Sequence, residues 1–351
     1  MKEEKVIQEI DELEDDGEGQ LYEHFRIVVD KGQVPVRIDK YMFERLVHSS
    51  RNRIQKAAEA GFVQVNDCPV KSNYKVRPND VIILMLDRPH YDTTIEAEDI
   101  PLNIVYEDEA LMVVNKPVGL VVHPGCGNYH GTLVNAVAWH LRNIEGYDPN
   151  DPEVGLVHRI DKDTSGLLVI AKTSDAKTRL GLQFFNKTTH RSYHALVWGN
   201  FDKNEGRIEG NIGRNPKDRQ QMIVFPPDSG IGKSAVTHYR VVERFGYVTL
   251  VECILETGRT HQIRAHMRHI GHPLFNDARY GGDQILKGLR SGTYQQFIKN
   301  CFDLCQRQAL HARTLGFVHP TTGKQMDFTS DLPEDMELLI QKWRVFINGI
   351  N

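Results

Sequence analysis

The densest group of chemically capable side chains lies over residues 157–165, between a short apolar stretch and a strongly apolar run. It contains Asp161 and Asp163, either of which could act as an acid, a base or a nucleophile. A charged loop between two buried strands presents its side chains at a sheet edge, where loops often carry function. The alternative is an ordinary turn, since Asp, Ser, Thr and Gly also bond local backbone amides. Residue chemistry alone leaves both interpretations open.

A second polar segment, residues 256–267, combines arginine and histidine with apolar residues at helical spacing. Thr260 is placed to cap a helix over 261–269, which puts Arg264 one turn along. A cation near the start of a helix opposes the helix dipole, so we expect its charge to serve a partner such as a buried carboxylate. An exposed arginine on a solvated helix is the alternative.

Four histidines between residues 261 and 272 raise the question of a metal site. Their spacing does not match His-Glu-x-x-His, and no carboxylate lies among them to complete a ligand set. We therefore expect no metal. Cys301 and Cys305 have no second pair nearby, so we expect them to share one helical face.

The total charge of −4 conceals a basic segment. Residues 1–30 hold 11 acidic and 3 basic side chains, whereas residues 31–90 hold 6 acidic and 11 basic ones. Cations clustered with amide and hydroxyl donors suit phosphate contacts, although a solvated helical face has the same composition. The candidate contacts are Arg37, Lys40, Ser50, Arg51, Arg53, Gln55 and Lys56.

Periodicity divides the chain into parts. Residues 1–20 are expected to be a disordered acidic tail, and a polar linker is expected over 89–100. In the unit between them, 21–88, the predicted elements are helices over 37–47 and 50–60 and strands over 62–65 and 81–86.

From residue 101 to 345, short β-branched runs alternate with a few helices. This pattern predicts an α+β domain with a mixed, largely antiparallel sheet and flanking helices. The predicted strands are 111–114, 119–122, 166–171, 193–198, 235–242 and 247–255, and the predicted helices are 131–141, 174–185 and 261–269.

Composition narrows the class of protein further. With 26% charged and 40% hydrophobic residues, the chain is neither collagen-like, wholly disordered nor disulfide-rich. No run approaches the roughly 18 apolar residues of a membrane span, and the acidic N-terminus does not read as a signal peptide. Five cysteines, few and odd in number, favour a reducing compartment. We expect a cytoplasmic monomer without a membrane partner.

Five motifs in one order resemble the pseudouridine synthases of the RluA type, over about residues 21–330. Residues 158–168, His-Arg-Ile-Asp-Lys-Asp-Thr-Ser-Gly-Leu-Leu, resemble that family's active-site loop, with Ile in place of Leu at 160. The other motifs lie at 115–125, 191–199, 258–273 and 310–320. The resemblance implies isomerisation of uridine within RNA, in which the C1′–N1 bond breaks, the base rotates and C5 bonds to C1′. No cofactor or metal is implied.

The resemblance also implies roles for particular residues. Asp161 would be the catalytic carboxylate, with Arg264 as the cation that favours its ionised form. Tyr193 would stack on the uracil and help to remove the C5 proton. Whether Asp161 attacks the sugar, attacks the base or removes a sugar proton stays open. The residues expected to handle the RNA where the uridine leaves its stack are Arg159, His158 and Thr164.

Residues 37–80 resemble the alpha-L module, a small α/β RNA-binding domain shared with a ribosomal small-subunit protein. Family members with this module most often act on large-subunit (23S) ribosomal RNA, so structured ribosomal RNA is the expected partner and transfer RNA is the alternative. Two other classes are weighed: a catalytically inert RNA-binding protein and a hydrolase with histidine-bound metal. The first would lack Asp161, Tyr193 or Arg264, and all three are present.

Overall fold

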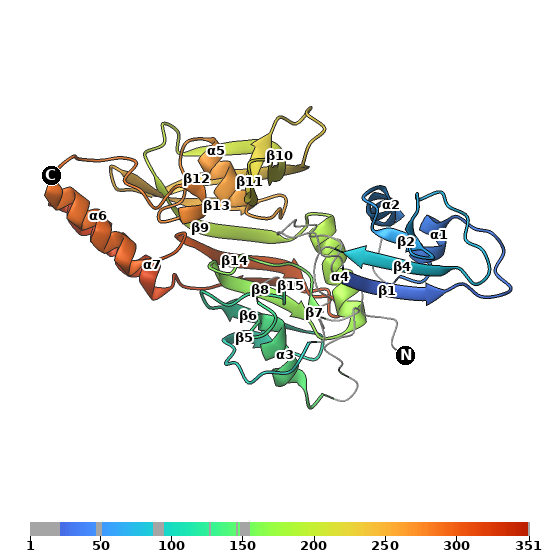
Figure 1. Ribbon diagram of the computed structural model, residues 1–351. Helices are drawn as coiled ribbons and strands as arrows, with labels where there is room; N and C mark the ends of the chain where they lie inside the picture. The colour runs from blue at the N-terminus through green and yellow to red at the C-terminus, as the bar shows by residue number, and fades with distance from the viewer. Residues whose placement is uncertain are drawn as a thin grey trace. The chain divides into compact units, whose positions relative to one another are not determined.

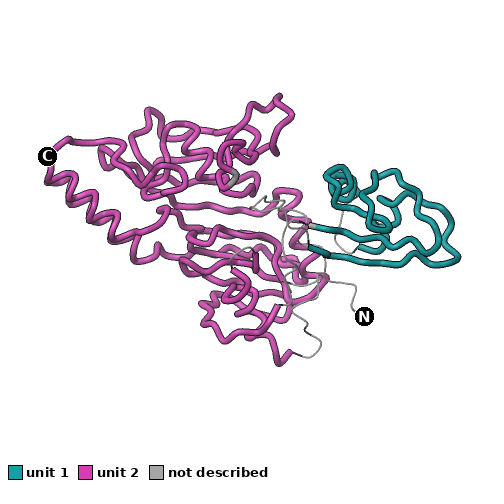
Figure 2. Tube along the Cα trace, in the orientation of Figure 1, with its two compact units in different colours: residues 1–94 teal, residues 95–351 magenta. Residues whose placement is uncertain are grey.

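A computed structural model of the chain describes residues 22–46, 51–86, 95–125, 128–144, 147 and 155–349. The expected acidic tail, Ser50 and the first part of the expected linker lie outside these residues. The chain divides into two compact units, residues 1–94 and 95–351 (Figure 2). Within the ranges given, no helix combines the length and the apolar character that crossing a bilayer requires.

The smaller unit is an antiparallel sheet with two helices. Its elements are β1 (Tyr22–Val28), α1 (Ile38–Phe43), α2 (Arg51–Glu59), β2 (Val63–Val65), β3 (Cys68–Pro69) and β4 (Val81–Leu86), with the strand order β1-β4-β2-β3. Tyr41, Met42 and Ile54 join strand residues in one core. The predicted helix over 37–47 is too long, because after Phe43 the chain turns and Leu46 reaches the core from that turn.

The larger unit is built on one mixed, mostly antiparallel sheet, as predicted (Figure 1). Its strands are β5 (Ile104–Glu107), β6 (Leu111–Lys116), β7 (Gly155–Leu156), β8 (Ser165–Ala171), β9 (His190–Trp198), β10 (Glu205–Asn215), β11 (Asp218–Phe225), β12 (Lys233–Arg244), β13 (Val248–Leu255), β14 (Leu310–Val318) and β15 (Gln325–Thr329). Its helices are α3 (Leu133–Leu141), α4 (Ser174–Phe185), α5 (Gln262–His269), the 3₁₀ helix η2 (Ala278–Tyr280), α6 (Gly292–Leu304) and α7 (Glu334–Asn348).

The strand order is β11-β10-β12-β13-β9-β14-β8-β6-β5, with β15 beside β14 and β7 beside β8. Helices α3 and α5 cover one face of the sheet, and α4, α6 and α7 pack against the other. Central strands are therefore buried on both faces, which explains the mostly apolar run of β8 in the sequence. Cys301 in α6 and Cys305 both point into the core, but Cys305 lies just beyond the helix, so the two do not share a helical face as predicted.

The middle of the sheet brings together the segments that carry the motifs. Strand β14 lies between β9 and β8, antiparallel to the first and parallel to the second (Figure 1). Ala312 is paired with both Tyr193 and Gly166. Gly166 has φ +118°, and a Cβ there would lie 2.2 Å from the Ala312 carbonyl oxygen, so only glycine fits.

The predicted strand over 119–122 is wrong. Pro117 has no N–H for a ladder, and Gly119 adopts φ +79° in a turn. The carbonyl groups of Val121 and Val122 accept hydrogen bonds from the first turn of α3 instead of from a strand. The apolar run is a partly buried connection into that helix, which periodicity over four residues cannot distinguish from a strand.

Candidate active site

Asp161 lies in the turn that leads into β8. Ile160 is buried on one side of it, and Thr164, 1% exposed, closes the turn by donating its N–H to the Asp161 carbonyl at 3.1 Å. The Asp161 side chain is 22% exposed. Both ends of the loop are therefore anchored while the carboxylate stays accessible.

Arg264 on α5 contacts Asp161, as the sequence predicts. Its Nη1 donates to Asp161 Oδ2 at 3.0 Å. The same guanidinium also forms a bidentate pair with Asp277, from Nε to Oδ2 at 2.7 Å and from Nη2 to Oδ1 at 2.9 Å. Asp277 is 1% exposed. This second carboxylate fixes the plane of the guanidinium, so that Nη1 is the group directed at Asp161.

The start of α5 differs from the prediction. The helix begins at Gln262, and the residue before it is His261 with a left-handed φ of 52°, so Thr260 is not the cap. The Gln262 side chain bonds to residues outside the helix: its Oε1 accepts from the Thr257 hydroxyl and the Arg259 N–H, and its Nε2 donates to the Val236 carbonyl. These bonds attach the start of α5 to the sheet and thereby set the position of Arg264.

His261 faces Asp161 from the other side of the loop. Its Nε2 lies 3.9 Å from Asp161 Oδ2, and its Nδ1 lies 2.9 Å from the Tyr280 hydroxyl. Burial lowers the pKa of His261 to about 4, so the ring is neutral near pH 7. The Tyr280 ring also lies 4.9 Å from the Arg264 guanidinium carbon. A left-handed φ in a non-glycine residue is typical of strain held at a functional site.

Tyr193 projects from β9 into the core cluster that contains Ile160 and Ile263. The residue is 7% exposed. Burial raises the pKa of Tyr193, and the charge of Asp161 adds to that rise while Arg191 opposes it. The phenol therefore stays protonated at neutral pH.

Two buried cations hold the backbone of the Asp161 loop. Lys116 at the end of β6 donates from Nζ to the carbonyl oxygens of Pro117, Leu120 and Lys162, each at 2.8 Å. Burial lowers its pKa to about 7. These bonds tie the turn after β6 to the carbonyl that follows Asp161.

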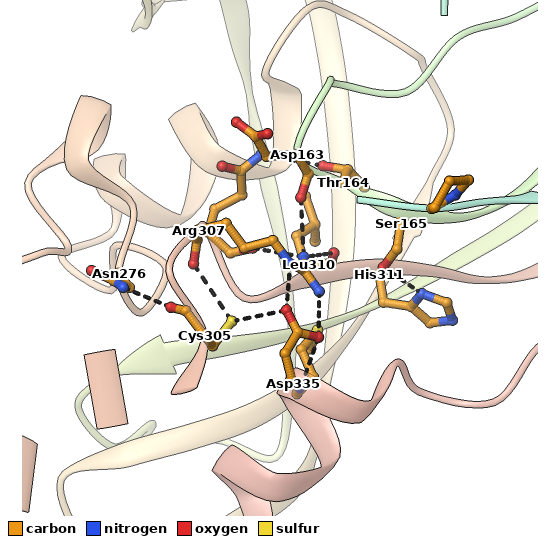
Figure 3. A network of polar contacts seen from close by, with 12 residues as sticks. Asp163, Thr164, Ser165, Asn276, Cys305, Arg307, Leu310, His311 and Asp335 are labelled. Atoms are coloured by element: carbon orange, nitrogen blue, oxygen red, sulfur yellow. Dashed lines mark hydrogen bonds and ion pairs between the residues drawn. The ribbon is translucent and has the colours of Figure 1, made fainter. Parts of the chain in front are cut away.

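Arg307 holds the next carbonyl of the loop, as Figure 3 shows. Its Nη1 donates to the Asp163 oxygen at 3.0 Å and also to the carbonyls of Gln308 and Leu310. Its other nitrogens form a bidentate pair with Asp335 in the first turn of α7. The active-site loop is therefore connected to the C-terminal helix through one side chain.

The residues predicted to handle RNA beside this loop have different environments. Arg159 is exposed. His158 accepts a hydrogen bond from the Val169 N–H at Nε2 and stacks on Phe184 with ring centroids 4.4 Å apart. Thr164 is buried, with Gln308 Nε2 3.4 Å from its hydroxyl. Of the three, Arg159 is the most exposed.

The predicted phosphate contacts of the smaller unit meet on one carboxylate. Asp39, fully buried, accepts two hydrogen bonds from Arg37, one from Arg51 and one from Gln55. The Arg37 and Arg51 side chains are still 47% and 48% exposed. Lys40 and Lys56 are exposed, and Arg53 is partly so.

Sequence reasoning missed Asp277, Lys116 and Arg307. One signal for Asp277 was available: a buried guanidinium has five donors, more than Asp161 alone can accept, and Asp277 is the first acidic residue after Arg264. For Lys116 and Arg307 there was no such signal, because their acceptors are mainly backbone carbonyls. Over the part of the chain that the structure describes, no three His, Cys, Asp or Glu side chains are grouped to hold a metal ion.

Comparisons with known proteins agree with this architecture. The family model described as RNA pseudouridylate synthase matches residues 110–269, and the S4 domain model matches residues 36–82. An uncharacterized RNA pseudouridine synthase of Chlorobaculum parvum is 46% identical over 322 residues, which cover 92% of this chain and 98% of that protein.

A second relative carries a more specific name. The ribosomal large subunit pseudouridine synthase D of Zymomonas mobilis is 41% identical over 309 residues, covering 87% of this chain and 93% of that protein. Among solved structures, human RNA pseudouridylate synthase domain containing 4 aligns with a TM-score of 0.53 and 22% identity, covering 69% of this chain and 93% of that one. At that identity the match supports the fold alone.

Proposed function

The chain belongs to the RNA pseudouridine synthases, and we propose that it isomerises uridine in large-subunit (23S) ribosomal RNA with Asp161 as the catalytic carboxylate. The observation that carries this proposal is the 3.0 Å contact between Arg264 Nη1 and Asp161 Oδ2. An adjacent cation favours the ionised carboxylate that the reaction needs. Because Arg264 occupies Oδ2, the oxygen left to act on the nucleotide is Oδ1.

The reaction exchanges one glycosidic bond for another. The N1–C1′ bond breaks, the uracil rotates, C5 bonds to C1′, and the proton on C5 leaves while N1 gains one. Attack on the sugar, attack on the base and removal of a sugar proton would all use Asp161 Oδ1. The carboxylate has to be ionised in each case, and the fixed guanidinium of Arg264 serves that requirement without moving.

Tyr193 provides an aromatic surface for the uracil in this scheme. Its raised pKa favours a stacking role over that of a proton acceptor, because a protonated phenol is a weak base. Chemistry on a base inside a duplex requires extrusion of the nucleotide, and exposed Arg159 is the side chain suited to enter the space left behind. His158 and Thr164 would hold the Asp161 loop in place through their hydrogen bonds to the Val169 N–H and to Gln308.

Two observations support ribosomal RNA as the substrate. The S4 domain supplies half-exposed arginines for phosphate contacts. Relatives at about the 41% level are named ribosomal large subunit pseudouridine synthases. Transfer RNA is the competing substrate class.

The experiment is a map of pseudouridines by carbodiimide primer extension in cells that lack the gene. We expect specific signals to vanish from 23S ribosomal RNA and to return with the wild-type gene but not with Asp161→Asn. Asp175→Asn is the matched control, because Asp175 is exposed on α4 and pairs with Arg179. Signals lost from transfer RNA instead would reassign the substrate, and restoration by Asp161→Asn would remove Asp161 from the chemistry.

A further inference from the structure

Among the side chains of the larger unit that the structure describes, three arginines are buried: Arg191, Arg264 and Arg307, with 7%, 6% and 6% exposure. Arg264 and Arg307 each bond to carboxylates. The Arg191 side chain has no hydrogen bond or ion pair to any residue that the structure describes, and its Nε is fully enclosed without an acceptor. A buried charge without a partner is strongly unfavourable, so such a group calls for an acceptor from elsewhere.

Among the residues that the structure describes, no carboxylate forms a hydrogen bond or ion pair with Arg191. Its guanidinium carbon lies 5.2 Å from the centre of the Phe184 ring. That ring stacks on His158, whose pKa is lowered to about 3 by burial and, secondarily, by the charge of Arg191. An aromatic face attracts a cation but leaves its N–H donors unsatisfied. Phe184 and neutral His158 therefore position Arg191 without neutralising it.

The location of Arg191 points to the substrate. It precedes Tyr193 by two residues on β9, so both side chains leave the same face of the strand, about 7 Å apart along it. Gly258, just before α5, lies against the end of the side chain: a Cβ there would come 3.0 Å from Arg191 Nη1. The φ of Gly258 is not left-handed, so its lack of a side chain serves to leave space next to the guanidinium.

We propose that Arg191 binds a backbone phosphate of the RNA beside the target uridine. The inference rests on the proposed function, because it takes the uracil to stack on Tyr193. A guanidinium binds phosphate through two parallel hydrogen bonds, and Arg191 has unused donors for both. Burial has already removed most of its water, so the phosphate meets a cation that is desolvated and held in place before the RNA arrives.

The protein-side test compares Arg191→Met with Arg179→Met, which removes an arginine already paired with Asp175 on the surface of α4. Release of tritium from [5-³H]uridine in transcribed 23S ribosomal RNA measures turnover. We expect Arg191→Met to raise KM about 10- to 100-fold with kcat within about threefold. The slope of log Kd against log salt concentration should decrease by the amount that about one phosphate contact contributes. Arg179→Met should change neither.

Thermal unfolding separates binding from a purely structural role. Removing an unpaired buried cation should leave the unfolding temperature of Arg191→Met equal to or above that of the wild type. A variant that unfolds at a lower temperature while KM and the salt slope stay unchanged would overturn the proposal. Arg191→Lys should bind with intermediate affinity, because it keeps the charge and loses the fork.

The RNA-side test uses a synthetic RNA with the mapped uridine and a neutral methylphosphonate at each neighbouring phosphate in turn. One substitution should weaken binding to the wild type by about the same factor as Arg191→Met, with no further loss when both changes are combined. The opposite outcome is that inorganic phosphate stabilises the wild-type protein while no methylphosphonate changes its affinity for RNA. The site would then hold a free anion, and the assignment to an RNA phosphate would be overturned. Asp161→Asn is assayed in parallel to separate the two proposals. If Asp161→Asn is active, the proposed function fails. If Asp161→Asn is inactive and Arg191→Met binds RNA normally, only the phosphate site is refuted.

Discussion

Each unit contains a cluster of carboxylate and arginine, and the two clusters are built in opposite ways. In the smaller unit, one carboxylate, Asp39, holds two arginines and is fully buried, while the arginines Arg37 and Arg51 are about half exposed. In the larger unit, one arginine, Arg264, holds two carboxylates and is 7% exposed, while Asp161 is 22% exposed.

The difference shows which partner is available for function. Whichever group lies at the centre of the cluster has its charge paired on two sides, and the groups around it keep unused donors or acceptors. The first cluster therefore offers cations, which suit phosphates, and the second offers a carboxylate, which suits chemistry on a nucleoside. Composition is similar in the two cases, so it is the count of donors against acceptors that distinguishes them.

The largest effect is expected from Arg264→Lys, which keeps the central charge and removes its planar geometry. A single ammonium cannot bond both oxygens of Asp277 and still direct a donor at Asp161. We expect the single-turnover rate of tritium release to fall about 10²-fold or more. Arg344→Lys, which alters an exposed bidentate pair with Glu243, is the control and should have no effect. A rate within threefold of the wild type would show that geometry at the centre of the cluster does not matter.

Asp277→Asn tests whether the buried carboxylate serves only to fix the arginine. The change leaves Arg264 with one charged partner, so we expect the free energy of unfolding to fall by about 3–5 kcal/mol. Turnover should also fall, about tenfold at saturating RNA, measured at a temperature where the variant is folded. Asp303→Asn, at an exposed position on α6, should change neither quantity. Lost stability with unchanged kcat would limit Asp277 to a structural role.

In the smaller unit, Asp39→Asn should weaken RNA binding and leave the rate of the chemical step unchanged. Arg37 and Arg51 lose the acceptor that aligns them, so we expect Kd for ribosomal RNA to rise about three- to tenfold, with kcat at saturating RNA unchanged. Fluorescence anisotropy with a labelled RNA fragment measures the first and tritium release the second. Asp67→Asn, in an exposed turn of the same unit, is the control. A fall in kcat would contradict this division of labour.

The smallest effect is a pH dependence confined to the smaller unit. Burial alone would raise the pKa of Asp39, but hydrogen bonds from Arg37, Gln55 and Arg51 lower it to about 2. A carboxyl with a lowered pKa stabilises the folded state above its unfolded pKa of about 4, and this contribution disappears as the pH falls from 4 through 2. Hydrogen exchange of the β4 amides, corrected for intrinsic rates, should lose protection over that range. In Asp39→Asn the same amides should show no such additional loss.

The sequence was most informative where the relevant interactions are local. Helix α4 covers the predicted residues 174–185 because Thr173 caps it and its apolar residues follow the helical period. Strands β8 and β13 were also found, since β8 is buried along its length and mostly apolar, and β13 is rich in β-branched and other apolar residues. The pairing of Arg264 with Asp161 was expected from the family resemblance, whereas residue chemistry alone predicted only that an arginine near the start of a helix would need a carboxylate partner.

The strands and side-chain roles that the sequence did not predict depend on contacts between residues far apart in the chain. Strands β10 and β11 were not predicted, because β10 is mostly polar and small residues and β11 opens with four polar residues, and the two are held by pairing with each other and of β10 with β12. The role of Arg307 depends on the Asp163 carbonyl, 144 residues away in the chain, and backbone carbonyls are the same at every position. Donor and acceptor counts can identify a missing partner, but only the fold shows which one is near.

The position of β14 has a consequence for how the enzyme is made. This strand is the bridge between β8 and β9, yet it follows β9 by more than a hundred residues, and its His311 meets Ser165 across a separation of 146. During synthesis β8 and β9 emerge first, each with an open edge, and neither can complete its pairing until residue 318 has left the ribosome. Such long-range closure makes folding slow. The carboxylate and the tyrosine are therefore brought together late, when nearly the whole catalytic unit has been synthesised.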